Sequence, residues 1–153
     1  MITELEQVQL FKDVSGEALK EINAFCTRLE LEDGDAFISE NDLHSRDLFL
    51  LCNGRVEIVT SSAGITSSES IISEQDKELF GEISWISGSK RTATVRCIGD
   101  VVAIRINGDQ FMAYLQSHPE TGFIVMRAIA GLVADSLSAT NQLLKQILWN
   151  TPL

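Results

Sequence analysis

Residues 48–59 read LFLLCNGRVEIV, two apolar runs separated by Asn53-Gly54. Asn and Gly both tolerate positive φ, so this pair predicts a tight turn between two strands. Further short apolar runs lie on both sides of this stretch, from Leu29 to Ile106, and turn signals separate them. Short strands at such close spacing favour a β-sandwich or barrel over a parallel α/β sheet.

Helical patterns flank the strand region. The spacing predicts a helix over about residues 15–27, a β-region over about 28–106 and C-terminal helices over about 108–148. We expect all of these elements to form a single domain, residues 1–153.

Polar residues that precede these helices are candidate N-caps. Ser15 is expected to cap the N-terminal helix, Asn107 the first C-terminal helix and Ser117 the second. Residues 60–73, rich in Ser and Thr, are read as an exposed hairpin loop.

The last helix carries apolar and small residues at alternating spacings of four and three. Such a seam is typical of a helix that pairs with another helix. We therefore expect a homodimer, although the same helix packed on its own domain is the alternative. The seam consists of Met126, Ala130, Val133, Leu137, Thr140, Leu144 and Ile147.

Composition excludes several classes of protein. The chain has 153 residues, 44% of them hydrophobic, and a net charge of −10. Such a surface repels phosphate backbones, so direct nucleic-acid binding is not expected. No uninterrupted apolar run approaches the roughly 20 residues of a membrane span. Residues 1–9 lack the pattern of a signal peptide.

The residues that enzymes and metal sites need are sparse. The two histidines, His44 and His118, lie far apart in the sequence, and no cysteine pair has zinc spacing. Catalysis, a metal site and a cofactor are therefore not expected. Cys26, Cys52 and Cys97 are read as reduced core thiols of a cytoplasmic protein.

The segment with the clearest chemistry is residues 80–95, FGEISWISGSKRTATV. Gly81 allows a close turn after a strand, and the next residues can form one helical turn whose first N–H groups face outward. Arg91 follows a turn and can offer a charge-assisted contact to a phosphate. Glu82 suits such a site only if it meets hydroxyls, as a ribose supplies. A phosphate and a ribose hydroxyl in one ligand would satisfy both side chains.

This segment resembles the phosphate-binding cassette of the cyclic nucleotide-binding domain family. That family occurs in the bacterial catabolite activator protein, in kinase regulatory subunits and in gated channels. Its pattern of Phe-Gly-Glu, a short apolar helix and Arg-x-Ala-x-Val is met by residues 80–82 and 91–95. The resemblance extends over residues 10–148. It implies an antiparallel β-roll of jelly-roll type with an N-terminal helix, a short cassette helix and a long C-terminal helix.

The resemblance also implies roles for single residues. Glu82 would accept a hydrogen bond from the ribose 2′-hydroxyl, and Arg91 would pair with the cyclic phosphate. Thr92 follows the arginine, as in cGMP-responsive members, so cAMP and cGMP both stay open as ligands. Ser136 and Thr140 are candidate base contacts, or are simply solvated or bonded to their own helix. The implied site residues are Gly81, Glu82, Ile83, Ser84, Arg91, Thr92, Ala93, Ser136 and Thr140.

The implied function is that of a cyclic nucleotide sensor. Ligand binding would reposition the C-terminal helix, and a separate effector protein could respond. The alternative is a non-catalytic interaction or dimerisation module with a vestigial pocket. The transcription factors of the family continue into a DNA-binding domain, whereas this sequence ends at Leu153, so DNA binding is not expected.

Overall fold

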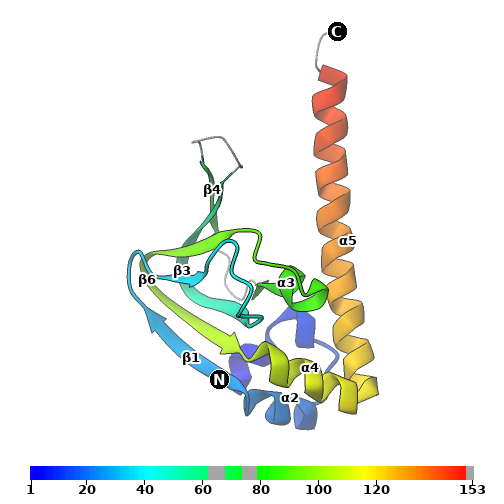
Figure 1. Ribbon diagram of the computed structural model, residues 1–153. Helices are drawn as coiled ribbons and strands as arrows, with labels where there is room; N and C mark the ends of the chain where they lie inside the picture. Colours follow the sequence, from blue (N-terminus) through cyan, green and yellow to red (C-terminus); the bar gives the residue numbers. More distant parts are fainter. Residues whose placement is uncertain (62–67, 74–78, 151–153) are drawn as a thin grey trace.

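The computed structural model describes residues 1–61, 68–73 and 79–150. A β-sheet body lies beside one long helix, α5, whose second half extends away from the body (Figure 1). The shorter helices gather at one end of the sheet. In chain order the elements are α1 (Ile2–Glu6), η1 (Gln9–Phe11), α2 (Gly16–Asn23), β1 (Cys26–Leu31), β2 (Ala36–Ile38), β3 (Leu48–Ser61), β4 (Ser68–Ser73), β5 (Leu79–Phe80), α3 (Glu82–Ser87), β6 (Thr94–Ile106), α4 (Gly108–Ser117) and α5 (Pro119–Asn150).

The strands form one antiparallel sheet, as the sequence predicts. Its order is β1-β6-β3-β4, with β2 added on β6 and β5 added on β3. The long strands β3 and β6 pair along most of their length, from Leu48 opposite Ile106 to Val59 opposite Thr94. These two strands are therefore the frame on which the shorter strands and the helices assemble.

Alternate residues of β3 serve two different hydrophobic cores. Leu48 and Leu50 pack with the helices, whereas Phe49 and Leu51 point into the roll. All four side chains are buried. A strand with both faces covered needs an unbroken apolar run rather than alternation. The run LFLL meets this need.

The predicted turn at Asn53-Gly54 is wrong, because β3 continues through it to Ser61. Gly54 has a φ of +113°, and the pairing with β6 shifts register on both sides of Asn53. A Cβ at Gly54 would lie 2.7 Å from the carbonyl oxygen of Asp100 on β6. The pair thus forms an irregularity within a paired strand, where positive φ and a close approach are both needed.

The helix starts follow two of the three predicted caps. The Ser15 hydroxyl accepts a hydrogen bond from the backbone N–H of Ala18 at 3.2 Å, and α2 begins at Gly16. The Asn107 side chain accepts from the N–H of Gln110 at 3.0 Å. The N-terminal helix ends earlier than predicted, at Asn23, because the chain enters β1 two residues after Ala24.

Two other local predictions are wrong. Ser117 is the last residue of α4, and its hydroxyl donates to the carbonyl of Tyr114 at 3.0 Å instead of capping α5. Within the predicted loop 60–73, Ser68–Ser73 forms strand β4 and pairs with β3. Residues 62–67 of that loop lie outside the described part of the chain.

The three cysteines make no disulfide, and the long helix α5 is unusually apolar. All three cysteines are free, and Cys26 and Cys97 are buried. Burial raises the pKa of the Cys26 thiol to about 12. By length and composition α5 qualifies as a membrane span, with a mean hydropathy of 1.5 over an 18-residue window of which 17% is buried. Helices that pack on protein can meet the same criterion of length and composition. The sequence analysis predicted no membrane span, because it looked for an uninterrupted apolar run.

The helical core depends on Phe111, whose side chain is fully buried between the rings of Phe11, Phe25 and Trp85. We predict that Phe111→Ala lowers the free energy of unfolding by about 3–5 kcal/mol, because it leaves a cavity among these rings. Urea denaturation measures the loss. Leu43→Ala, at a side chain 61% exposed, is the control and should change stability by less than about 0.5 kcal/mol. Equal losses in the two variants would contradict this description of the core.

Candidate functional site

A cavity of about 280 Å³ opens where β5, α3 and the start of β6 meet. This volume is close to the lower end of the range of about 300–1,000 Å³ that is typical of small-molecule sites. The wall is apolar, apart from four polar or charged side chains that come from α3 and from the residues just before β6. The lining residues are Ile38, Ile58, Leu79, Phe80, Gly81, Glu82, Ile83, Ser84, Arg91, Thr92, Ala93 and Val95.

Gly81 sets the geometry of the cavity, because it turns the chain from β5 into α3. Its φ is +95°, a conformation that L side chains rarely adopt. A Cβ at this position would lie 2.6 Å from Nη1 of Arg91 and 2.8 Å from the carbonyl oxygen of Asp47. The absence of a side chain therefore lets Arg91 lie directly against the backbone. α3 then runs for six residues and ends at Ser87, and the C-cap residue Gly88 also has positive φ.

Arg91 is the central side chain of the site and is only 3% exposed. Its Nη1 donates to the carbonyl of Gly81 at 3.1 Å and to the hydroxyl of Ser84 at 2.6 Å. Its Nη2 donates to the carbonyl of Asp47 at 2.6 Å and to the hydroxyl of Ser45 at 3.4 Å. The guanidinium thus joins the start of α3 to the segment that precedes β3.

One donor of this guanidinium is left over. The Nε of Arg91 is buried and has no hydrogen-bond partner among the described residues. Burial lowers the pKa of Arg91, and the nearby carboxylates of Asp42 and Asp47 oppose this effect. Arginine remains charged in proteins, so the cavity wall contains a buried cation with an unpaired N–H group. Such a group costs about 1–3 kcal/mol until an acceptor reaches it.

The segment before β3 was missed by sequence reasoning. Arg46 donates from Nη1 to the carbonyl of Ser84 at 3.2 Å, so it holds α3 from a second side. The carboxylate of Asp47 accepts from the N–H of Gly108 at 2.9 Å, which ties this segment to the first turn of α4. In two contacts, Arg91 with Asp47 and Arg46 with Ser84, the acceptor is a backbone carbonyl. Every residue type has such a carbonyl, so the sequence did not indicate these acceptors.

The structure gathers seven of the predicted site residues, those from Gly81 to Ala93, around the cavity. Ser84 and Arg91 are buried, Glu82 is half-buried, and Thr92 is exposed. The two residues predicted on the last helix are not among the lining residues. Ser136 and Thr140 lie on the exposed half of α5, where the Thr140 hydroxyl donates to the Ser136 carbonyl at 2.9 Å.

The apolar lining was also missed, although the alternation of strand residues contains a signal for it. Ile38, Phe80 and Val95 are buried and belong to the core inside the roll, which the cavity adjoins. Over the described part of the chain no group of three or more His, Cys, Asp or Glu residues could hold a metal ion. His44 and His118 are both exposed.

Trp85 connects the cavity to the helices. It lies in α3 and is only 3% exposed, so it is a core residue. Its indole Nε1 donates to the carbonyl of Gly108 at 2.9 Å, and its ring stacks on Phe111 at a centroid distance of 5.1 Å. A displacement of α3 therefore acts directly on α4, the helix that precedes α5.

Comparison with known proteins gives relatives of one domain family. Residues 28–118 match the family model of the cyclic nucleotide-binding domain. The cone photoreceptor cyclic nucleotide-gated channel subunit alpha of Gallus gallus is 28% identical over 122 residues, which are 76% of this chain and 16% of the channel. The chain thus spans about a sixth of the length of that relative.

Solved structures share the fold. The catabolite activator protein of Thermus thermophilus superposes with a TM-score of 0.75 at 21% identity, covering 91% of this chain and 62% of that one. The regulatory domain of the Toxoplasma gondii cAMP-dependent kinase, solved with cAMP, has a TM-score of 0.65 at 19% identity, covering 74% of this chain and 42% of that one. Domains of this kind are regulatory and non-catalytic. With its antiparallel roll, its cassette helix and a family model that matches more than half of its residues, the chain belongs to the cyclic nucleotide-binding domain family.

Proposed function

We propose that this chain is a regulatory sensor whose cavity binds a cyclic nucleoside monophosphate, cAMP or cGMP. The observation that carries the proposal is the buried Nε of Arg91, which has no acceptor among the described residues. A phosphate oxygen supplies the charged acceptor that this cation lacks, and charge-assisted hydrogen bonds are about twice as strong as neutral ones. The carboxylate of Glu82 lines the same cavity and suits a sugar hydroxyl.

The rest of the ligand meets different chemistry. Ile58, Leu79 and Val95 offer an apolar wall for a flat base, whereas Thr92 is an exposed hydroxyl beside Arg91. None of the apolar groups distinguishes adenine from guanine by hydrogen bonding, so both nucleotides remain in the proposal. The kinase regulatory domain solved with cAMP supports a ligand of this class.

Signal output would pass through α3. Ligand contacts to this helix shift Trp85, and Trp85 moves α4 through its bond to Gly108 and its stacking on Phe111. α5 follows directly after α4 and is repositioned. The ligand drives this shift only to the extent that it binds the two helix positions with different affinity.

The proposal includes a homodimer formed through α5. From Ala130 onward the helix is exposed, and its seam residues Val133, Leu137, Leu144 and Ile147 are 43–59% exposed. Large apolar side chains at heptad spacing are stabilised when a second helix covers them. A separate effector protein would read the change. Free, largely buried thiols agree with a cytoplasmic location.

The first prediction concerns the ribose contact. Wild-type protein should gain about 2.7 kcal/mol of stability at a cAMP or cGMP concentration of a hundred times the dissociation constant. Glu82→Gln should weaken cAMP binding by about 10–100-fold, since one charged hydrogen bond is lost. Thermal unfolding measures the gain in stability, and isothermal titration with cAMP and with 2′-deoxy-cAMP measures the loss of binding.

The deoxy ligand makes this test specific. If Glu82 holds the 2′-hydroxyl, wild type and Glu82→Gln should bind 2′-deoxy-cAMP equally. Glu120→Gln, in the first turn of α5, is the charge-matched control and should leave binding unchanged. If neither cyclic nucleotide raises the melting temperature, the proposal is wrong and the alternative holds, an interaction module with a vestigial pocket.

A second prediction uses two glycines with similar backbone conformations. Gly81→Ala should weaken nucleotide binding at least about tenfold, because its Cβ displaces the guanidinium of Arg91. Gly34→Ala is the matched control, since Gly34 has a φ of +88° but no atom within 4 Å of an added Cβ. Both variants should lose about 1–3 kcal/mol of stability from backbone strain. Equal nucleotide affinity in the two variants would show that Arg91 does not contact the ligand.

The third prediction addresses the seam. Leu144→Asp should dissociate the dimer, because it places a charge in an apolar interface, yet it should not unfold the domain, since Leu144 is 53% exposed in the single chain. Analytical ultracentrifugation measures the dissociation constant. Ala139→Asp adds the same charge on another side of α5 and is the control. A dimer equally stable in both variants would contradict the seam.

A further inference from the structure

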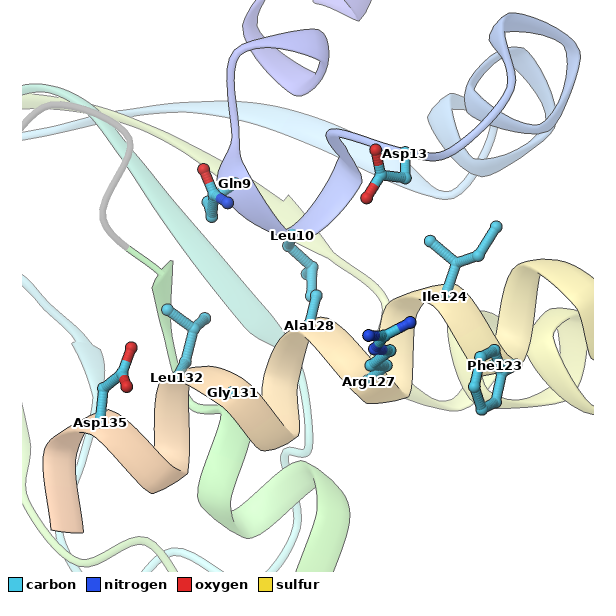
Figure 2. A pocket seen from close by; sticks show the side chains of 10 residues that line it. All are labelled: Gln9, Leu10, Asp13, Phe123, Ile124, Arg127, Ala128, Gly131, Leu132 and Asp135. Atoms are coloured by element: carbon cyan, nitrogen blue, oxygen red, sulfur yellow. The ribbon is translucent and has the colours of Figure 1, made fainter. Parts of the chain in front are cut away.

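A second cavity shares no lining residue with the cavity beside Arg91. It has a volume of about 430 Å³ and lies between η1 with its flanking residues and the first half of α5. Figure 2 shows Gln9, Leu10 and Asp13 facing α5 across the opening. From α5 the cavity is lined by Phe123, Ile124, Arg127, Ala128, Gly131, Leu132 and Asp135.

The cavity has open space over the backbone of α5 and charged side chains at its edge. A Cβ added to Gly131 would meet no atom within 4 Å. Phe123 stands at the edge of the cavity with 66% of its surface exposed. Arg127 and Asp135 are exposed too, and within the described ranges neither side chain makes a hydrogen bond or an ion pair. The site can therefore receive a flat apolar group with a cation beside it.

The cavity residues of α5 belong to a row that continues to the end of the helix. Ile124, Ala128, Gly131 and Asp135 are spaced by four, three and four residues, so they lie on one side of α5. The same steps lead on to Ser138, Gln142, Lys145 and Trp149. Trp149, at the far end of this row, is 86% exposed. One side of α5 thus holds an open cavity at one end and an uncovered indole at the other.

We propose that α5 of a second copy packs antiparallel along this row, so that Trp149 of each copy enters the cavity of the other. A two-fold axis beside residue 140 places residue 149 opposite 131, 145 opposite 135 and 142 opposite 138. The indole then lies over Gly131, where the space is open, with the guanidinium of Arg127 one turn away on the same side. Cation–π contact adds to the burial of the ring.

Charge selects this orientation. The antiparallel pairing places Lys145 of each copy opposite Asp135 of the other, which gives two ion pairs related by symmetry. A parallel pairing in register would place Lys145 beside Lys145 and Asp135 beside Asp135. Within residues 128–150 these are the two charged residues, so this part of the helix is neutral while the whole chain carries −10. Two copies therefore meet where their mutual repulsion is lowest.

The occupant is a second copy because the row complements itself. Both the cavity and the aromatic group that fits it come from this chain, and so do both members of the charge pair. The row lies on a different side of α5 from the seam of Val133, Leu137 and Leu144, so the two surfaces do not compete. The inference does not depend on nucleotide binding.

Tryptophan fluorescence tests the proposal on the full chain. The chain has two tryptophans, and Trp85 is already buried with its Nε1 bonded, so a change in emission reports Trp149. We expect the emission to shift to shorter wavelength as protein concentration rises, in step with association measured by sedimentation. Gly131→Leu fills the cavity without touching the core and should abolish the shift.

Charge exchange supplies the matched control. Lys145→Asp and Asp135→Lys should each weaken this association at least about tenfold, because like charges replace both ion pairs. The double variant carries the pair in reversed order and should restore both association and the emission shift. All of these positions are exposed, so the folded domain should persist, which circular dichroism verifies.

Several results would overturn the proposal. One is association without an emission shift, which would leave the seam as the contact. Another is an unchanged shift in Gly131→Leu, and a third is a double variant that stays as weak as the single ones. An emission shift that needs phosphatidylcholine vesicles, with no self-association in their absence, would assign the row to a lipid surface instead.

Discussion

The buried guanidinium of Arg91 is the contact on which the rest of the site depends. Its two terminal nitrogens bond the carbonyls of Gly81 and Asp47, which lie in segments far apart in the sequence. Without this cation, the carbonyl of Asp47 would lose its short charge-assisted bond in a partly buried place, which is costly, whereas the carbonyl of Gly81 still accepts from the N–H of Trp85 at 3.2 Å. The local fold and the proposed anion binding thus rest on one side chain. The same contact explains why Gly81 has no tolerated Cβ: the arginine occupies the space that a side chain would fill.

The segment before β3 extends this contact into the helices. The backbone of Asp47 holds Arg91, while its carboxylate holds the first turn of α4 and lies 3.6 Å from Arg105 of β6. Trp85 makes a second connection to the same turn of α4. The cavity is therefore joined to α4 by two independent routes, one through the loop and one through α3. In the proposed function, this double connection would carry changes in either wall of the cavity to α4, and from there to α5.

Local features were predictable from the sequence, and features set by distant pairing were not. The cap at Ser15 and the short helix after Gly81 depend on neighbouring residues, and both are present. Asn53-Gly54 has the composition of a turn, but pairing with β6 on both sides keeps the strand continuous, and only the three-dimensional contact with Asp100 reveals this. The role of Asp47 could not be predicted from its residue type, because its backbone carbonyl is the group that accepts from Arg91. The cassette was found because its glycine, acid and arginine are specific to one chemistry.

α5 shows why periodicity predicts some contacts and misses others. Its seam is visible because large apolar residues repeat, whereas the row from Ile124 to Trp149 is polar or small in the middle and attracts no attention as a pattern. Only the structure shows that Gly131 faces open space and that Leu10 of η1 lines the same cavity. A glycine that lowers helix propensity at an exposed position needs a reason in packing. The cavity supplies the reason, since any side chain at residue 131 would occupy the space that an aromatic ring from another helix requires.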